Sequence, residues 1–292
     1  MTTELDLDTV RGLLPGRPEE GHKGTFGHLF VIAGSIGFTG AAKMTGLGAY
    51  RSGAGLVTAG IPHPLAGIVA SGLMEVMYLR LPSTEDESVA HDALEPALRF
   101  AAGRDAVVIG PGLSRNSSTV SFVLDFILRC EAPMVIDADA LNAISENRAI
   151  LSQEHGPWIL TPHPGEMARI ADLSTGAVQQ DREGVARRMA EESGSVVVLK
   201  GNRTVFAAPG QNPVANPTGN HGLATGGTGD VLSGMLGALL AQGMAPWTAA
   251  RVGVYAHGLA GDIAADRNTP RAMTAGDVID ALPEAWRELE PA

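Results

Sequence analysis

Short apolar runs alternate with longer segments of helical periodicity along most of the chain. The runs are rich in branched residues and show little alternation between apolar and polar positions, which predicts strands buried on both faces of a sheet. They occupy Leu29–Ala33, Leu56–Ala59, Ala106–Ile109, Met134–Ile136, Trp158–Leu160 and Val196–Leu199.

The segments between these runs have the spacing of amphipathic helices. Helices are predicted at Thr39–Ser52, Ser117–Arg129, Asp139–Ser145, Glu166–Ala171 and Val178–Glu192. The repeated order of strand, helix and strand favours right-handed crossovers. We therefore predict an α/β fold in which a mainly parallel central sheet carries helices on both faces.

The pattern changes after the last of these runs. Thr204–Ala208 and Pro213–Asn216 are separated by a Pro-Gly-containing turn, which predicts a small antiparallel extension of the sheet. Three helices are expected to follow, at Asp230–Gln242, Pro246–Asp266 and Ala275–Leu289. Because no internal repeat or long linker divides the sequence, we expect a single domain over residues 1–292, in which residues 1–21 form a polar N-terminal leader.

Composition and charge exclude several classes of protein. The 37 glycines among 292 residues recur in short clusters between the apolar runs, which indicates many tight turns. A net charge of −11 argues against a nucleic-acid partner, although backbone N–H groups and a few local cations can still hold an anionic substrate. Cys130 is the only cysteine, so no intramolecular disulfide can form. The acidic N-terminus lacks the pattern of a signal peptide and no apolar stretch reaches the roughly 20 residues that span a bilayer, so we expect a cytoplasmic protein with no membrane association.

The strongest candidate site is the glycine-rich turn at residues 226–230, Gly-Gly-Thr-Gly-Asp, which directly precedes an apolar helix pattern. Glycines let backbone N–H groups converge at the helix N-terminus, where unpaired donors and the positive end of the helix dipole favour an anion. Thr228 can add a hydroxyl, and Asp230 is expected to face the same cavity from the first helical turn. The alternative is that Asp230 only caps the helix. Asp277 follows a glycine without a glycine cluster, and we interpret it as such a cap.

Two further loops place polar side chains at the carboxyl ends of predicted strands, the edge where α/β folds bind ligands. Lys200 follows the last long apolar run; the alternative is a solvated charge in a hairpin turn. His163 and Glu166 lie in the loop Thr161–Glu166; the alternatives are a locally satisfied histidine and a simple acid of the first helical turn. Similar loops follow other strands, at Gly110–Leu113 and Asp137–Ala140. No group of His, Cys, Asp and Glu has the spacing of a metal cage, and the Walker phosphate-binding pattern is absent.

Taken in order, these segments resemble the NAD(P)H-hydrate dehydratase family of the ribokinase-like superfamily, in its stand-alone form. Each motif alone is moderately specific, but the ordered set is highly specific and covers nearly the whole chain from His22 onward. The matching segments are His22–Gly27, Ala33–Ser35, Gly40–Ala42, Arg51–Val57, Gly110–Leu113, Asp137–Leu141, Thr161–Glu166, Lys200–Thr204, Asn216–Asn220 and Gly226–Leu232.

The resemblance implies a ribokinase-like fold and repair of hydrated nicotinamide cofactors. Water would be removed from the S epimer of hydrated NADH or NADPH, with ADP converted to AMP and phosphate, or ATP to ADP. The resemblance also implies Mg²⁺ as a cofactor, a separate epimerase as a functional partner, and a homo-oligomer, specifically a tetramer.

The resemblance also assigns roles to individual residues. Asp230 would be the general base, and the turn formed by Gly227, Thr228 and Gly229 would stabilise the transferring phosphoryl group. The nucleotide would be bound by Lys200, Gly201, Asn202, Arg203, Thr204 and Gly229. The hydrated cofactor would be bound by Gly40, Ala41, Gly112, His163 and Asp230. Glu166 would help to place Mg²⁺, commonly through water.

Two departures from the family and two alternative functions remain open at this point. Thr225 stands where some relatives have lysine, and the fused epimerase domain of many relatives is absent. One alternative is a ribokinase-like kinase of a vitamin precursor, of the hydroxymethylpyrimidine or hydroxyethylthiazole type, which would share the Gly-Thr-Gly-Asp turn but not the early segments. The other is a non-catalytic nucleotide sensor, against which the intact Asp230 counts.

Overall fold

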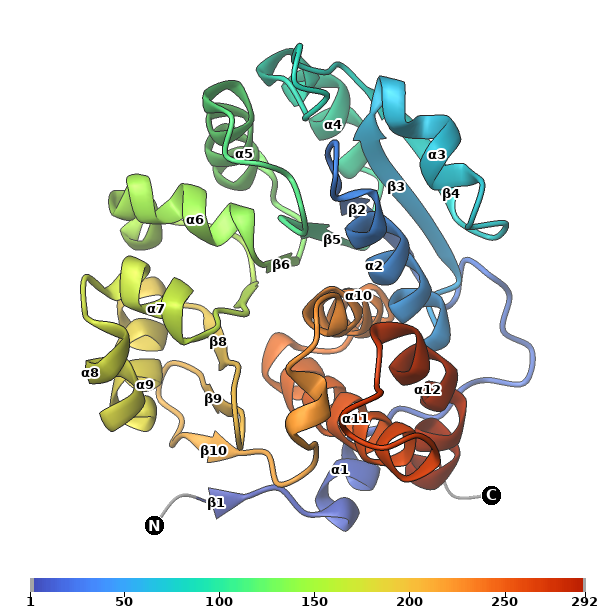
Figure 1. Ribbon diagram of the computed structural model, residues 1–292, viewed down its shortest axis with the longest axis vertical. Helices are drawn as coiled ribbons and strands as arrows, with labels where there is room; N and C mark the ends of the chain where they lie inside the picture. The colour runs from blue at the N-terminus through green and yellow to red at the C-terminus, as the bar shows by residue number, and fades with distance from the viewer. Residues whose placement is uncertain (1–2, 291–292) are drawn as a thin grey trace.

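The computed structural model describes residues 3–290, and its strands form one ten-stranded sheet in the order β1-β10-β9-β8-β7-β6-β5-β2-β3-β4 (Figure 1). The strands are β1 Thr3–Glu4, β2 His28–Ile32, β3 Leu56–Pro62, β4 Met77–Leu81, β5 Ala106–Ile109, β6 Met134–Ile136, β7 Trp158–Leu160, β8 Val196–Leu199, β9 Val205–Ala207 and β10 Val214–Ala215. Neighbouring strands are parallel from β4 to β8. Strand β9 runs antiparallel to both β8 and β10. The predicted parallel sheet and its antiparallel extension are therefore both confirmed.

Helices cover both faces of the sheet (Figure 1). They are α1 Leu7–Leu13, α2 Thr39–Arg51, α3 Ala66–Ala70, α4 Leu94–Ala101, α5 Ser117–Arg129, α6 Asp139–Glu146, α7 Pro164–Ala171, α8 Thr175–Gln180, α9 Arg182–Ser193, α10 Thr228–Ala241, α11 Pro246–Arg267 and α12 Ala275–Leu289. Successive side chains of a strand enter different cores, as β geometry requires. Leu29 and Val31 pack with α2, α10, α11 and α12, whereas Phe30 and Ile32 pack with α4, α5, α6, α7 and α9.

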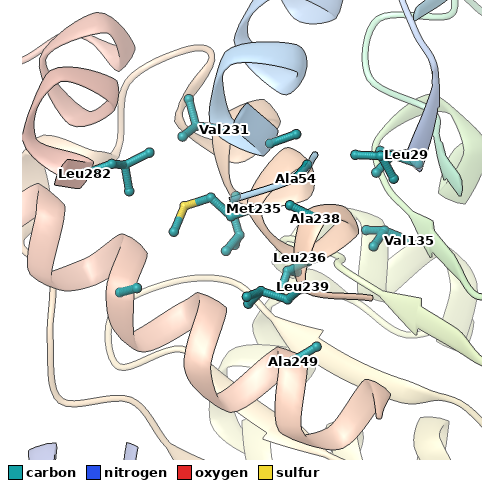
Figure 2. Close-up of a cluster of buried hydrophobic side chains, with 14 of the residues drawn as sticks. Leu29, Ala54, Val135, Val231, Met235, Leu236, Ala238, Leu239, Ala249 and Leu282 are labelled. Atoms are coloured by element: carbon teal, nitrogen blue, oxygen red, sulfur yellow. The ribbon is translucent and has the colours of Figure 1, made fainter. Parts of the chain in front are cut away.

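Helix α10 lies at the centre of one core and is buried almost all round (Figure 2). Its side chains Val231, Met235, Leu236 and Leu239 share this core with residues of the sheet and of α12. Helices α2 and α10 run side by side at backbone contact, because a Cβ added to Gly234 would lie 2.0 Å from the carbonyl oxygen of Thr45. Only glycine permits such an approach. The contact holds the middle of α10, whose N-terminus carries the glycine-rich turn, against α2.

The structure departs from the sequence prediction in three places. Residues 3–21 are not simply a polar leader, since β1 pairs with β10, and Leu5 and Val10 are buried; residues 1–2 of the predicted leader lie outside the described residues. The helix predicted at Val178–Glu192 is divided into α8 and α9, because Asp181 caps the second helix by accepting the N–H of Gly184. Strand β4 and helices α3 and α4 had no predicted counterpart. No helix within residues 3–290 is both long and apolar enough to cross a membrane.

Candidate active site

The glycine-rich turn forms the N-terminus of α10, as predicted. Gly227 is the residue before the helix and adopts a left-handed φ of 94°, which favours glycine. Within residues 3–290, the backbone N–H groups of Gly229 and Asp230 have no backbone acceptor. The Thr228 hydroxyl is already engaged, because it lies 2.7 Å from the carbonyl oxygen of Leu223 and 2.9 Å from that of Thr225. The turn therefore offers backbone N–H groups, rather than a free hydroxyl, to an anion.

Asp230 is the third residue of α10, and no hydrogen-bond donor in the described part of the chain reaches its carboxylate. Burial, together with the charges of Asp137 and Asp139, raises the pKa of Asp230 to about 7, although Lys200 opposes the shift. A carboxyl group with this pKa is partly ionised at neutral pH and can accept a proton from a bound group. The local geometry is thus different from that of a simple helix cap.

Asp277 shows what a cap at the same helical position looks like. It is the third residue of α12, and its Oδ2 accepts hydrogen bonds from the N–H and the hydroxyl of Thr274 at 2.8 and 2.7 Å. These bonds hold the pKa of Asp277 below its ordinary value. The interpretation of Asp277 as a plain cap is confirmed.

Lys200 is not a solvated charge. It follows β8 at the carboxyl edge of the sheet, and its Nζ lies 2.6 Å from Oδ1 of Asp137, whose side chain is 1% exposed. The other carboxylate oxygen of Asp137 accepts the hydroxyl of Ser233 at 2.7 Å. Burial by itself would lower the pKa of Lys200, but the charges of Asp137 and Glu166 outweigh it and raise the pKa. Lys200 is therefore a fixed cation beside the turn, with its ammonium 3.5 Å from where a Cβ on Gly229 would lie.

A cavity of about 600 Å³ opens beside the turn and Lys200. It is lined by all six residues that the resemblance assigns to the nucleotide, namely Lys200, Gly201, Asn202, Arg203, Thr204 and Gly229. His163 and Thr228 also line it. Asp230, Gly40, Ala41 and Gly112 do not belong to its wall. Of the residues assigned to the hydrated cofactor, only His163 therefore belongs to the wall of this cavity.

His257 of α11 is a cavity residue that the sequence reading missed. Its Nε2 lies 2.9 Å from the carbonyl oxygen of Thr228, and burial lowers the pKa of His257 to about 4. The ring is therefore neutral at physiological pH, Nε2–H donates to that carbonyl, and Nδ1 is left as an acceptor. His257 lines the cavity, so this acceptor is available to a hydrogen-bond donor of a bound ligand.

Gly112 and Ala41 meet on the α2 side of the site. A Cβ on Gly112 would lie 2.8 Å from Cβ of Phe38 and 2.9 Å from Cβ of Ala41, so any larger residue would displace the start of α2. The Ser35 hydroxyl donates to the Gly112 carbonyl at 2.8 Å and holds the loop in place. Phe38, which precedes α2, is 61% exposed. The structure thus joins Gly40, Ala41 and Gly112 in one wall with an exposed aromatic ring at its rim.

His163 and Glu166 cap α7. Nδ1 of His163 accepts the N–H of Gly165 at 2.9 Å, and Oε2 of Glu166 accepts the N–H of His163 at 2.8 Å. Glu166 is 5% exposed, and burial raises its pKa, with Asp137 acting in the same direction. A carboxylate that is buried and used in this way does not suit direct ligation of Mg²⁺. Within residues 3–290, no three His, Cys, Asp or Glu side chains converge as metal ligands.

Arg203 and Thr225, two cavity residues noted in the sequence, are held by contacts with other parts of the chain. Arg203 forms an ion pair with Glu4 of β1, so the N-terminal strand is tied to the loop that follows β8. The Thr225 hydroxyl donates to the carbonyl of Gly222 at 2.9 Å. Thr225 therefore stabilises the turn, and Lys200 is the cation beside the N–H groups of Gly229 and Asp230.

In the sequence, Asp137 is only one residue of a predicted loop, and Ser233 carries no signal of its own. The signal was present in the Asp-Ala-Asp-Ala motif after a buried strand, because the carboxyl ends of parallel strands meet at one edge. What the sequence could not supply was the partner: Ser233 is 96 residues away and reaches Asp137 only because α10 packs against β5 and β6.

A cavity at the carboxyl edge of a mainly parallel sheet, next to a glycine-rich helix N-terminus, defines the class of α/β proteins that bind a phosphorylated ligand. Comparison with known proteins identifies the family. A family model described as NAD(P)H-hydrate dehydratase matches residues 29–284. A bifunctional NAD(P)H-hydrate repair enzyme from Moorella thermoacetica is 46% identical over 280 residues, which cover 96% of this chain and 53% of that protein.

Relatives of the chain's own length match as well. An ADP-dependent (S)-NAD(P)H-hydrate dehydratase from Bacillus subtilis is 37% identical over 282 residues, and the match covers 96% of both proteins. The crystal structure of an ADP/ATP-dependent NAD(P)H-hydrate dehydratase from Bacillus subtilis, co-crystallized with ATP and Mg²⁺, has a TM-score of 0.84 at 34% identity and covers 99% of both chains. A ribokinase-like superfamily protein from Enterococcus faecalis, 25% identical, also has a TM-score of 0.84 over 99% of this chain and 96% of that one.

The chain belongs to the NAD(P)H-hydrate dehydratase family, and its fold is ribokinase-like. The resemblance seen in the sequence is confirmed. The chain spans about half the length of several relatives that it matches, which are bifunctional repair enzymes.

Proposed function

We propose that the protein dehydrates the S epimer of hydrated NADH or NADPH at the expense of ADP or ATP, and so regenerates the reduced cofactor. The observation that carries the proposal is Asp230, a carboxyl group with a pKa of about 7 at the end of a turn of free backbone N–H groups. The names of the full-length relatives support the same reaction.

The proposed reaction begins when Asp230 removes the proton from the ring hydroxyl of the hydrate. The hydroxyl oxygen attacks the terminal phosphorus of the nucleotide, and the bond to the leaving phosphate oxygen breaks, which releases AMP from ADP or ADP from ATP. The nitrogen lone pair of the ring then expels the new phosphate ester as inorganic phosphate. Loss of a proton from the adjacent ring carbon completes the reduced nicotinamide.

Backbone N–H groups of Gly227, Gly229 and Asp230 would hold the transferring phosphoryl group. They are fixed before the reaction, so they stabilise developing charge without reorganisation. The Lys200 ammonium would add a positive charge from the nucleotide side, where its pairing with Asp137 keeps it in place. His257 would accept a hydrogen bond from a hydroxyl or amino group of the nucleotide.

The hydrated cofactor would lie on the other side of Asp230, against Gly40, Ala41 and Gly112. The Cβ contacts of Gly112 require glycine at this position, so no side chain projects from it toward the ring of the hydrate. His163 would reach the cofactor only from the rim, because its Nδ1 already caps α7.

Mg²⁺ would enter bound to nucleotide phosphates and water, since residues 3–290 supply no cage for it. When bound, the ion would neutralise phosphate charge. Our proposal includes a cytoplasmic location, a homotetramer and a separate epimerase that converts the other epimer of the hydrate.

The test follows the near-ultraviolet absorbance of the reduced nicotinamide after purified protein, Mg²⁺ and ADP, or ATP in parallel, are added to hydrated NADH. We expect a nucleotide-dependent rise that Asp230→Asn reduces at least about 100-fold. Asp277→Asn, at the same helical position of α12, serves as the matched control and should leave the rate unchanged. A flat trace with both nucleotides, from protein that binds them, would contradict the proposal, and a stable phosphorylated product would identify a small-molecule kinase instead.

A further inference from the structure

A second cavity, of about 510 Å³, lies at the other ends of α2 and α10. Its wall includes Ser52 and Gln242, the residues that follow the last turns of these two helices. Trp286 of α12 and the segment 14–18 complete it. Asp230 and Gln242 are twelve residues apart on one helix, about 18 Å at the rise of an α-helix, so this cavity is separate from the nucleotide cavity.

Two segments that take no part in the candidate active site converge here. The turn around Phe26 and the segment around Ser52 and Gly53 both line the cavity. They are held together by a hydrogen bond of 3.0 Å from the N–H of Gly55 to the carbonyl of Phe26, and a Cβ on Gly55 would lie 1.8 Å from the carbonyl oxygen of Lys23. The back of the cavity is therefore built from tightly fitted backbone.

The cavity carries two guanidinium groups in a chain whose net charge is −11. The Arg17 guanidinium lies 3.9 Å from the centroid of the Phe26 ring and donates to the carbonyl of Gly53 at 3.3 Å. Neither Arg17 nor Arg51 forms an ion pair with a carboxylate of residues 3–290, and Glu290 is the one acid of the wall. The N–H groups of Arg17 that do not donate to Gly53 can donate to a carboxylate or a phosphate.

The wall also contains two polar residues whose buried atoms lack partners. Oγ of Ser52, a residue 5% exposed, and Nε1 of Trp286 have no hydrogen-bond acceptor or donor in the described part of the chain. Because Ser52 lines the cavity, its unpaired hydroxyl is a candidate donor to a ligand that binds there. The apolar part of the wall includes Leu239, Met244 and Pro283, and Thr25 and Gln242 add further polar groups.

We propose that this second cavity binds a small anion that carries a flat apolar ring, an aromatic carboxylate or an aromatic phosphate. Arg17 holds the anionic group, the Ser52 hydroxyl donates to it, and the ring packs against Leu239, Met244 and Trp286. The site is independent of the proposed dehydratase reaction, and its test needs no turnover.

The test measures binding of phenylacetate and of phenyl phosphate by calorimetry, with the nucleotide cavity filled by excess ADP. We expect one saturable site per chain for at least one probe, with a Kd below about 1 mM. Arg17→Gln should weaken binding about ten-fold or more, because a charge-assisted hydrogen bond is lost. Arg80→Gln, an exposed arginine of the edge strand β4, is the matched control and should bind as the wild type does. The tighter probe shows whether the site prefers a carboxylate or a phosphate.

Ser52→Ala keeps the test decisive if Arg17→Gln fails to fold. This small change should weaken binding about three-fold or more and leave the unfolding curve close to that of the wild type. No saturable binding of either probe to wild-type protein, or unchanged affinity in the folded variants, would overturn the proposal.

Discussion

Removal of the Asp230 charge should stabilise the fold while it abolishes turnover. The carboxyl group has a pKa of about 7 in the folded protein against an ordinary value of 3.8, first because it is buried and then because Asp137 and Asp139 lie near it. Folding therefore holds this group where its ionised form is disfavoured. Asn at this position has a similar shape and no charge, so it escapes that penalty.

The size of the effect follows from the two pKa values. They differ by about three pH units, and each unit corresponds to about 1.4 kcal/mol, which sets an upper bound of about 4 kcal/mol. The side chain is partly exposed and Lys200 is close, so we reduce the expectation for Asp230→Asn to about 2 kcal/mol above pH 7. Between about pH 4 and 7 the unfolded chain has lost a proton that the folded protein keeps, so wild-type stability falls as the pH rises through this window. The advantage of the variant should shrink toward pH 4 and disappear well below pH 3.8, where both states are protonated.

Urea unfolding of the wild type and of Asp230→Asn at several pH values between 5 and 8, about one unit apart, tests this reasoning. Turnover of the variant, measured in parallel, should fall at least about 100-fold. Asp277→Asn is the control at the matched position of α12, where hydrogen bonds from Thr274 favour the ionised form. That substitution should lower stability by about 0.5 kcal/mol or more and leave turnover unchanged.

An Asp230→Asn variant that is no more stable than the wild type at pH 8 would refute the argument. So would a stability difference that stays constant from pH 5 to 8, because it would show that the titration of this carboxyl is not the cause.

Three further predictions concern the groups around Asp230. Lys200→Met should lower the free energy of unfolding by about 3–5 kcal/mol, because it leaves the Asp137 carboxylate buried without its partner. In urea unfolding, the double variant with Asp137→Asn should regain most of this loss. A Lys200→Met variant as stable as the wild type would contradict this account. His257 should stay neutral in an NMR titration down to about pH 4. Because the histidine of the unfolded chain binds a proton at a higher pH than that of the folded protein, the free energy of unfolding should fall as the pH drops below 6.5. The His257→Phe variant should show a smaller pH dependence of stability. Glu166→Gln should need the same Mg²⁺ concentration for turnover as the wild type, and a chelator should stop turnover of both proteins. A variant that needs about ten-fold more Mg²⁺ would show that Glu166 does help to hold the ion.

The parallel strands and the longest helices were predictable because their pattern is local. Strands β5 to β8 and helices α5 and α12 have the predicted bounds, since each is a continuous apolar run or an amphipathic repeat with a clear cap. Strand β4 was not predicted, because it lies at the edge of the sheet, where Met77 and Tyr78 are exposed and the apolar signal is weak. Helix α1 was not predicted, because it has one buried residue, Val10, and therefore no apolar repeat in the sequence.

The candidate site was predictable as a set of loops but not as a network. The turn before Asp230 and the lysine after β8 are visible in the sequence, since glycine clusters and strand ends carry local signals. The pairing of Lys200 with Asp137 is not visible, because it joins residues 63 positions apart across two strand ends. Two alternatives raised for the loop after β7 describe the observed cap of α7: His163 is locally hydrogen-bonded, and Glu166 is an acid of the first helical turn.

The position of Asp230 depends on helix packing that leaves almost no trace in the sequence. Asp230 lies one turn before Gly234 on α10, and Ala41 lies one turn before Thr45 on α2, so the Gly234–Thr45 contact holds the helix of the proposed base against the helix that carries Ala41. Gly48, which meets the backbone of Val231, tightens the same seam. A side chain at either glycine would push α2 away from α10 and separate the wall from the base. These interior glycines, unfavourable for an isolated helix, therefore set the geometry on which the proposed chemistry depends.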